Sequence, residues 1–372
     1  MRNNYFSEKY WKDSVIAEKI LKEIFCISKK IKSEVKIMEV CGTHTMAIAA
    51  SGIRNILPDN VNLISGPGCP VCVTSAGDID RIISLSEIAG GRLIITTFGD
   101  MLKVPGSGRK TLSEAKVNGT DVRIVYSPLD ALKLALDNPQ KEVIFVGVGF
   151  ETTAPVIAST VKEARNNNID NFCVTPLFKL VPPALRFLLD SKIAKIDAFL
   201  LPGHVSAIIG YSPYLFLVKE YSMPGTVAGF EPLDILRGIS LILKQIESGR
   251  PSLDVEYSRV VKKDGNRTAL AVMEEVYGTC DAEWRAVGKI KDSGYVFSKK
   301  YEAYDAFKRF SVKAKDAREP AGCLCGNILL GLSVPSACPH FAKSCTPQNA
   351  IGPCMVSSEG ACAAWYRYGI KK

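Results

Sequence analysis

The sequence of 372 residues contains no apolar run that approaches 18 residues, so it offers no candidate for a membrane-spanning helix. Its first ten residues also lack an apolar core and a small-residue cleavage site, which argues against a secretory signal. Hydrophobic residues make up 47% and charged residues 23% of the chain, and this composition excludes a mainly disordered protein. We therefore expect a soluble cytoplasmic protein of two or three domains, with no membrane contact.

Histidine is scarce, with three in the chain, whereas cysteine is plentiful, with twelve. In a reducing cytoplasm, thiols are more typical of metal ligands, redox pairs or buried apolar residues than of a disulfide framework. The formal net charge of +9 is mild for this length. Residues 285–318 hold ten Lys or Arg against four Asp or Glu, but no nucleic-acid-binding motif accompanies them. We interpret this stretch as a solvated surface and expect no nucleic-acid partner.

Short apolar runs that end in Gly, Pro or Thr alternate with segments of helical periodicity over the first 250 residues. This alternation predicts an α/β fold with mainly parallel sheets. The predicted strands are Val35–Val40, Val61–Ser65, Leu93–Phe98, Val122–Tyr126, Val143–Val148, Phe172–Thr175 and Ala198–Leu201. The predicted helices are one around Ile16, Ile20 and Ile24, and then Asp78–Ile88, Leu129–Leu136, Thr153–Ala164, Pro183–Leu189, Pro232–Ile246 and Asn266–Val276.

Several short motifs occur twice. Gly149-Phe150-Glu151 recurs as Gly229-Phe230-Glu231, and Pro67-Gly68-Cys69 and Pro202-Gly203-His204 each follow a predicted strand. These echoes favour two similar Rossmann-like parallel-sheet domains that face each other across a cleft. After them we expect a small irregular C-terminal iron–sulfur domain, because the last segment is rich in Cys, Pro and Gly and has little periodicity. The predicted domains are residues 1–50 (N-terminal helix and first strand), 51–150 (first α/β domain), 151–250 (second α/β domain), 251–318 (helical and basic connector, irregular over Gly288–Tyr304) and 319–372 (cysteine-rich).

The C-terminal segment carries the strongest chemical signal. Six cysteines fall within the last 50 residues, at positions Cys323, Cys325, Cys338, Cys345, Cys354 and Cys362. Four thiolates suit zinc or a [4Fe–4S] cluster, but the segment lacks the tight C-x2-C knuckles of zinc ribbons. Prolines stand beside Cys338 and Cys354, as they often do in iron–sulfur sites. Spacing does not decide which four cysteines are ligands, and the remaining two could form a redox dithiol.

Two further cysteine motifs lie at predicted strand ends. Cys69-Pro70-Val71-Cys72 precedes a predicted helix, and its C-x-x-C spacing is typical of redox exchange or metal binding, although a structural role stays open. Cys41 also precedes a predicted helix, whose start would stabilise a thiolate. His44 follows three residues later and could be a second metal ligand, a proton donor or a structural histidine.

Two more candidates come from the repeated motifs. His204 stands at a strand end in the second half and could polarise or protonate a ligand in the cleft. Glu231 stands in the second Gly-Phe-Glu motif, as Glu151 stands in the first. Each carboxylate could act in the cleft, or it could only cap the helix that follows it.

With these motifs in view, the sequence resembles the HypD family of hydrogenase maturation factors over nearly its whole length. The resemblance is carried by Glu39-Val40-Cys41-Gly42-Thr43-His44-Thr45, Gly66-Pro67-Gly68-Cys69-Pro70-Val71-Cys72, Gly149-Phe150-Glu151-Thr152-Thr153-Ala154-Pro155, Pro202-Gly203-His204, Gly229-Phe230-Glu231-Pro232, Cys345-Thr346-Pro347 and Gly352-Pro353-Cys354-Met355-Val356-Ser357-Ser358-Glu359-Gly360-Ala361-Cys362. It implies a scaffold for assembly of the Fe(CN)2CO unit of [NiFe]-hydrogenase.

The resemblance also implies partners and cofactors. The family pairs with the small chaperone HypC to hold the iron, receives cyanide through HypE, with HypF upstream, and passes the finished unit to the hydrogenase large-subunit precursor. It carries a [4Fe–4S] cluster in the C-terminal part. The Fe(CN)2CO iron is a transient cargo.

Carried over to this chain, the resemblance makes Cys41 the thiolate on the iron, with His44 close by as a ligand or neighbour. Cys69 and Cys72 become a thiol pair on the cleft wall. By similarity to the cluster of ferredoxin:thioredoxin reductase, the cluster ligands are Cys323, Cys338, Cys345 and Cys362, with Cys325 and Cys354 as the adjacent dithiol.

A second interpretation belongs to a different class. The chain could be a cluster-dependent thiol–disulfide oxidoreductase that reduces Cys69–Cys72 and then a partner protein. The Cys41–His44 motif favours the scaffold, because a general reductase does not need it. Whether the chain is an enzyme stays open, since a scaffold with redox activity need release no small product.

Overall fold

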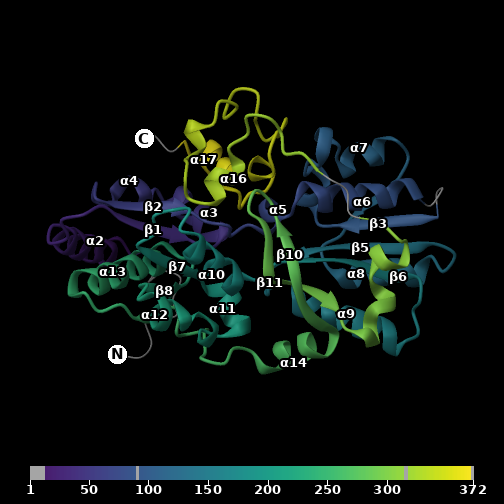
Figure 1. Cartoon of the computed structure of the whole chain (residues 1–372), viewed down its shortest axis with the longest axis horizontal. Coiled ribbons are helices and arrows are strands. Elements are labelled where there is room, and N and C mark those ends of the chain that lie inside the picture. The colour runs from purple at the N-terminus through teal and green to yellow at the C-terminus, as the bar shows by residue number, and fades with distance from the viewer. Residues whose placement is uncertain (1–12, 89–91, 314–316, 370–372) are drawn as a thin grey trace.

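The computed structural model describes residues 13–88, 92–313 and 317–369 (Figure 1). Two parallel sheets lie side by side, and a long hairpin runs between them. The cysteine-rich C-terminal tail lies over both, at the top of Figure 1. Within the described ranges, no helix combines the length and hydropathy that crossing a membrane requires.

The first sheet has the strand order β2-β1-β7-β8-β9, and all of its neighbouring strands are parallel. Its strands are β1 (Val35–Glu39), β2 (Val61–Ser65), β7 (Ala198–Pro202), β8 (Gly225–Ala228) and β9 (Leu253–Val255). Strand residues alternate between two apolar cores, as the period of a strand requires. Ile37 packs with α2 and α13 on one face, whereas Met38 packs with α5 and α10 on the other.

The second sheet has the order β4-β3-β5-β6 and is also entirely parallel. Its strands are β3 (Leu93–Thr97), β4 (Asp121–Ile124), β5 (Glu142–Gly149) and β6 (Phe172–Phe178). Ile94 faces the core beneath α8 and α9, and Ile95 faces the core beneath α6. Both sheets are thus covered on both faces, as parallel sheets need to be, and the predicted α/β class with two Rossmann-like sheets is confirmed.

The helices follow the strands in alternation. The α-helices are α2 (Ser14–Ser28), α3 (Gly42–Ser51), α4 (Ile53–Ile56), α5 (Pro70–Val73), α6 (Ala76–Ile88), α7 (Leu112–Val117), α8 (Pro128–Asp137), α9 (Ala154–Asn166), α10 (Val181–Ser191), α11 (Gly203–Ile209), α12 (Phe216–Tyr221), α13 (Pro232–Ser248), α14 (Arg267–Val276), α15 (Ala306–Arg309), α16 (Cys325–Leu329) and α17 (Ala361–Tyr368). Short 3-10 turns are η1 (Gly99–Lys103), η2 (Ser107–Arg109), η3 (Ser212–Tyr214), η4 (Lys299–Tyr304), η5 (Pro335–Ala337) and η6 (Pro353–Met355).

The sheets do not divide the chain at residue 150. Strands β1 and β2 share a sheet with β7–β9, which come from beyond residue 197, and β1 pairs with β7. The second sheet uses residues 93–178 without a break. Strand β1 lies between β2 and β7, with Ile37 opposite Leu63 on one side and Ala198 on the other. All three residues are buried in the same apolar core, which favours this pairing. The domain boundaries predicted from the sequence stay a prediction, but no single cut in the chain separates the two sheets.

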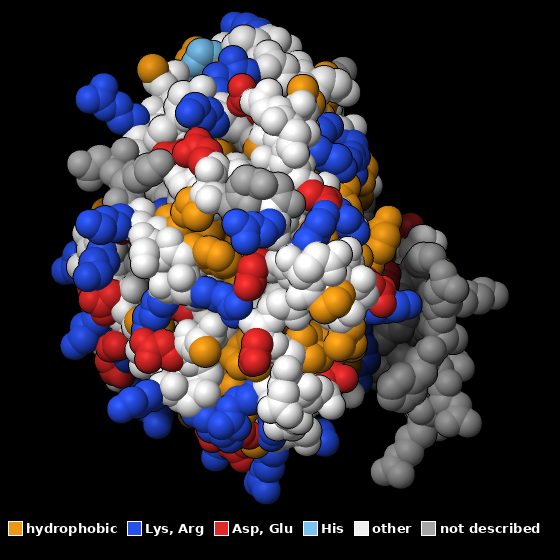
Figure 2. All heavy atoms as spheres, turned by 90° about the vertical axis from the view of Figure 1, so that its right-hand side faces the viewer, with side chains coloured by type: hydrophobic (Ala, Val, Ile, Leu, Met, Phe, Trp, Pro, Cys, Tyr) orange, Lys and Arg blue, Asp and Glu red, His pale blue; other side chains and the backbone are white. Residues whose placement is uncertain are grey.

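The hairpin is the main departure from expectation. The segment Gly288–Tyr304, expected to be an irregular connector, instead contains the strand β11 (Gly288–Phe297), which pairs antiparallel with β10 (Tyr277–Trp284). Exposed residues interrupt the apolar pattern of both strands, and burial comes from packing against β6 and α10. On the face that Figure 2 shows, Lys and Arg side chains are interspersed with Asp and Glu.

Candidate functional site

Cys41 lies where β1 turns into α3. It is the N-cap residue of α3, in an extended conformation, and 9% of its surface is exposed. The backbone N–H of Gly42 donates to the carbonyl oxygen of Gly68 at 2.8 Å, which joins this turn to the one after β2. A Cβ on Gly68 would lie 2.4 Å from the backbone nitrogen of Cys41. Only glycine therefore allows the turn after β2 to approach the turn after β1 this closely.

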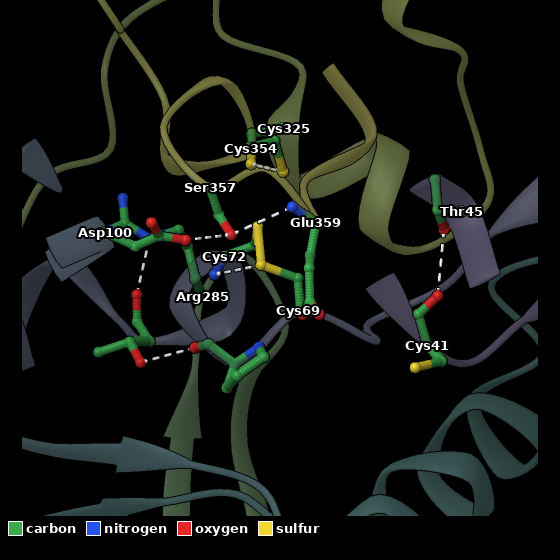
Figure 3. Close-up of a disulfide and its surroundings, with 12 residues drawn as sticks. Cys41, Thr45, Cys69, Cys72, Asp100, Arg285, Cys325, Cys354, Ser357 and Glu359 are labelled. Carbon is green, nitrogen blue, oxygen red and sulfur yellow. Dashed lines mark hydrogen bonds between the residues drawn. A yellow bond between two sulfur atoms is a disulfide. The ribbon is translucent and has the colours of Figure 1, made fainter. Parts of the chain in front are cut away.

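The second turn carries a disulfide between Cys69 and Cys72 (Figure 3). Cys69 caps the four-residue helix α5, and Pro70 occupies its first position, where the missing N–H costs nothing. Both cysteines are buried. The sequence left open redox exchange, metal binding and structure for this pair, and the structure holds it in the oxidised state.

The tail reaches the start of α3 through Glu359. Its Oε1 accepts a hydrogen bond from the Thr43 hydroxyl at 2.8 Å, and a Cβ on Gly42 would lie 2.6 Å from the Glu359 Cβ. Burial, and then the charge of Glu359, raises the pKa of the Cys41 thiol to about 11. The backbone N–H groups of Thr43 and His44 at the helix start lower the Cys41 pKa, as expected for such a position, but desolvation outweighs their effect.

His44 and His204 sit on either side of one aromatic ring. The Phe230 ring centroid lies 4.6 Å from that of His44 and 3.8 Å from that of His204, and both pairs are stacked. Nε2 of His44 lies 2.8 Å from the carbonyl oxygen of Gly229. The motifs that contain His44, His204 and Phe230 are thus brought together in the helix that begins after Cys41 and around it.

Burial fixes the protonation of His44. The ring is fully buried, and desolvation lowers its pKa to about 4, so the imidazole is neutral near pH 7. Because a carbonyl can only accept, Nε2 carries the proton and Nδ1 keeps its lone pair. Nδ1 has no hydrogen-bond partner among the described residues. Burial also lowers the pKa of His204.

The two Gly-Phe-Glu motifs differ in what their carboxylates do. Glu231 is exposed and is the N-cap residue of α13, where its backbone N–H donates to Asp234 Oδ2 at 3.4 Å. Glu151 is 2% exposed, and its Oε1 accepts the backbone N–H of Val181 at 2.9 Å. Glu231 thus caps its own helix, whereas Glu151 caps α10, and no described contact brings Glu231 to Cys41.

The six tail cysteines gather in one place. The Sγ atoms of Cys325 and Cys354 lie 2.6 Å apart, and both residues are free thiols. The other four are Cys323, Cys338, Cys345 and Cys362, and all are buried or half-buried. Burial, and then the charges of Cys325, Cys323, Cys345 and Cys338, raises the pKa of Cys362 well above its ordinary value, which places all five thiols in one electrostatic neighbourhood.

Within the Cys325–Cys354 pair, the two thiols differ. The hydrogen bond from Cys354 lowers the pKa of Cys325, and the same bond raises that of Cys354. The positive charge of Arg285 adds to the effect on Cys325. Helix α5, which carries Cys72, contacts the η6 turn, which carries Cys354. Figure 3 shows the Cys325–Cys354 pair, from α16 and η6, above the Cys69–Cys72 disulfide, with Cys41 to one side.

Two residues in this region were not recognised as candidates from the sequence: the buried Arg285 and the half-buried Glu359. Glu359 stands inside a recognisable motif, but nothing in the sequence says that it reaches the start of α3. Arg285 stands in a basic stretch interpreted as solvated, yet it is 2% exposed. A cavity of about 920 Å³ lies between α9 and α14, and none of the motif cysteines lines it.

Comparison with known proteins agrees with these motifs. The model of the hydrogenase formation hypA family, HypD, matches residues 15–369. The hydrogenase maturation factor HypD of Rhodobacter capsulatus is 43% identical over 369 residues, which cover 96% of this chain and 97% of that protein. HypD of Cupriavidus necator is 43% identical over 89% of each chain, and HypD of Escherichia coli is 43% identical over 92% of this chain and 91% of its own. The chain therefore belongs to the HypD family of hydrogenase maturation factors.

Proposed function

We propose that this protein is the scaffold on which the Fe(CN)2CO unit of [NiFe]-hydrogenase is assembled, with Cys41 as its thiolate ligand to the iron cargo. The observation that carries the proposal is the convergence at Cys41. The disulfide turn approaches it through Gly68, the tail through Glu359, and the second half of the chain through the His44–Phe230 stack.

The environment of Cys41 suits a ligand that is used only when iron arrives. Burial holds the thiol protonated, with its pKa raised to about 11. An iron ion replaces the proton, because bonding to the metal offsets the cost of a buried thiolate. Iron that carries cyanide and carbonyl ligands prefers soft donors such as thiolate. The neutral His44, with a free lone pair on Nδ1, is a second donor or a hydrogen-bond acceptor beside the iron.

We propose that the tail holds a [4Fe–4S] cluster rather than a single metal ion. Among the described residues, no three His, Cys, Asp or Glu side chains lie close enough to hold one ion. The thiols nevertheless share one neighbourhood, as expected for cysteines that surround a larger group. Cys323, Cys338, Cys345 and Cys362 would hold the cluster. When bound, it supplies electrons one at a time.

The two cysteine pairs can exchange electrons without any further reactant. In the structure, Cys325 and Cys354 are free thiols, and Cys69 and Cys72 form a disulfide. A thiolate of the first pair attacks one sulfur of the disulfide, and the other sulfur leaves as a thiolate and takes up a proton. The second thiol then loses its proton and closes a Cys325–Cys354 disulfide. The first pair is oxidised by two electrons, and Cys69 and Cys72 are reduced.

Membership of the family supports a proposal about partners. The relatives are named as hydrogenase maturation factors, so the pathway that assembles the hydrogenase is the setting of this chain. We propose that a HypC chaperone completes the iron site with its own thiolate, that HypE delivers the cyanide it obtains from HypF, and that the large-subunit precursor accepts the finished unit. We propose that this assembly takes place in the cytoplasm.

The alternative is a general thiol–disulfide oxidoreductase, and one comparison separates the two. The Cys41→Ser variant should lose iron binding with the HypC partner but keep Cys69–Cys72 exchange. The Cys325→Ser variant should lose exchange but keep the cluster absorbance and about four iron and four sulfide per chain. A Cys41→Ser variant that still supports iron-unit assembly would exclude the scaffold and leave the reductase.

A further inference from the structure

The tip of the β10–β11 hairpin lies between the disulfide and the cysteine-rich tail. Trp284, the last residue of β10, forms an antiparallel bridge with Thr74, two residues beyond Cys72. The backbone N–H of Arg285 donates to the carbonyl oxygen of Val73 at 2.8 Å. The end of β10 is therefore bonded through its backbone to the residues that follow Cys72. Figure 3 shows Arg285 beside Cys72.

The guanidinium group of Arg285 binds three separate segments. Its side chain is 1% exposed. Nε donates to the carbonyl oxygen of Thr74 at 2.8 Å, and Nη2 donates to that of Pro105 at 3.1 Å. Nη1 donates to Glu319 Oε2 at 2.7 Å, and Glu319 leads into the cysteine-rich tail. A planar fork with fixed donors suits three such acceptors, whereas an ammonium group could not reach them all.

The other side of the tip touches the tail directly. Ala286 has a left-handed backbone, with φ of 61°, and its Cβ would lie 2.1 Å from a Cβ placed on Gly326. Gly326 follows Cys325 in α16. The tip is thus bonded to the segment after Cys72 on one side and packed against the helix of Cys325 on the other.

We propose that Arg285 is a positioning residue that holds the Cys325–Cys354 thiols in register with the Cys69–Cys72 disulfide. The proposal rests on the exchange between the two pairs described above. Exchange requires the attacking sulfur, the attacked sulfur and the leaving sulfur to be aligned, and a small displacement of reacting groups can slow a reaction by orders of magnitude. Arg285 reduces this freedom by tying the tail, through Glu319, to the segment that follows the disulfide.

A trapping experiment tests the proposal. In the full chain with Cys354→Ser, the Cys325 thiolate attacks the disulfide and forms one mixed disulfide. Because the second thiol is missing, this bond cannot be resolved. The other cysteine of the Cys69–Cys72 pair is released as a thiol, which retains the proton balance. The rate is followed without oxygen by alkylation and peptide mass spectrometry.

We expect Arg285→Met to slow trapping about tenfold or more and Arg285→Lys to recover part of the loss, since lysine keeps the charge but not the fork. Glu319→Gln, which leaves the guanidinium and both carbonyl bonds intact, should slow it less than Arg285→Met and is the variant to use if the latter does not fold. Arg123→Met is the control and should trap at the unaltered rate, because the Arg123 guanidinium binds Asp121 within β4 and not the segments that Arg285 joins.

The outcomes separate the two proposals. Equal trapping rates with and without Arg285 overturn the positioning role and leave the exchange intact. A chain that forms no mixed disulfide even with Arg285 present overturns both, because the pairs then do not meet. A fall in thermal stability without a fall in the trapping rate means that Arg285 is only structural.

Discussion

Glu151 provides the sharpest test of the buried electrostatics. Its carboxyl group is 2% exposed, Oε1 accepts the Val181 N–H, and Oε2 has no hydrogen-bond partner within the described part of the chain. Desolvation raises its pKa from 4.5 to about 7. The titratable side chains that respond to its charge are the tyrosines Tyr214 and Tyr295, whose pKa values it helps to raise.

The sign of the pH effect follows from this shift. Below pH 4.5 the carboxyl is protonated in both states and contributes nothing. Above pH 4.5 the unfolded chain releases the proton while the folded chain keeps it up to about pH 7. The free energy of unfolding therefore falls by about 1.4 kcal/mol per pH unit over this window, or about 3 kcal/mol in all.

The Glu151→Gln variant should remove this loss, because glutamine keeps an oxygen for the Val181 N–H and does not titrate. We expect the variant to match the wild type near pH 4 and to exceed it by about 3 kcal/mol near pH 8, as measured by denaturant unfolding without oxygen at several pH values. Glu275→Gln is a control of opposite sign, since hydrogen bonds from Lys162, Lys300 and Tyr301 lower the Glu275 pKa to about 2. A difference between Glu151→Gln and wild type that does not change with pH would refute the reasoning.

Two further substitutions test the packing around the site. Gly68→Ala should abolish iron binding with the HypC partner, measured by metal analysis, because its Cβ would lie 2.4 Å from the nitrogen of Cys41. Gly278→Ala, which would meet nothing within 4 Å, should change neither iron binding nor, by more than about 1 kcal/mol, the free energy of unfolding. Arg54→Met should cost about 3–5 kcal/mol in denaturant unfolding, because it leaves the fully buried Glu39 without its ion pair. Adding Glu39→Leu should recover most of that loss. If stability does not recover, the loss does not come from an unpaired charge on Glu39.

Much of the fold was predictable from local pattern. Runs such as Val143–Val148 are apolar throughout, and in an α/β chain that pattern fits a strand buried on both faces. The seven predicted strands are all present, and so is the N-terminal helix, whose isoleucines Ile20 and Ile24 are buried. The membership of the two sheets was not predictable, because strand order depends on which edges pair and not on the composition of each strand.

The hairpin and parts of the site could not be predicted, because they depend on contacts between distant segments of the chain. β10 and β11 alternate too irregularly to be recognised, and their burial comes from other elements. The cysteine and histidine motifs could be found from spacing, but the rise of the Cys41 pKa comes first from burial in the tertiary structure and then from the charge of Glu359, more than 300 residues away. Arg285 lies in a run of exposed charges, and only the tertiary structure reveals that it is buried.

The most direct test of the scaffold is infrared absorption by cyanide and carbonyl groups on the protein. The full chain is purified without oxygen together with its HypC partner, from cells that supply the ligands. We predict both sets of absorption bands for the wild type and for Cys26→Ser, since Cys26 is an exposed cysteine on α2. The bands should be absent from Cys41→Ser. Bands of full intensity in Cys41→Ser would contradict the claim that this buried thiol holds the iron.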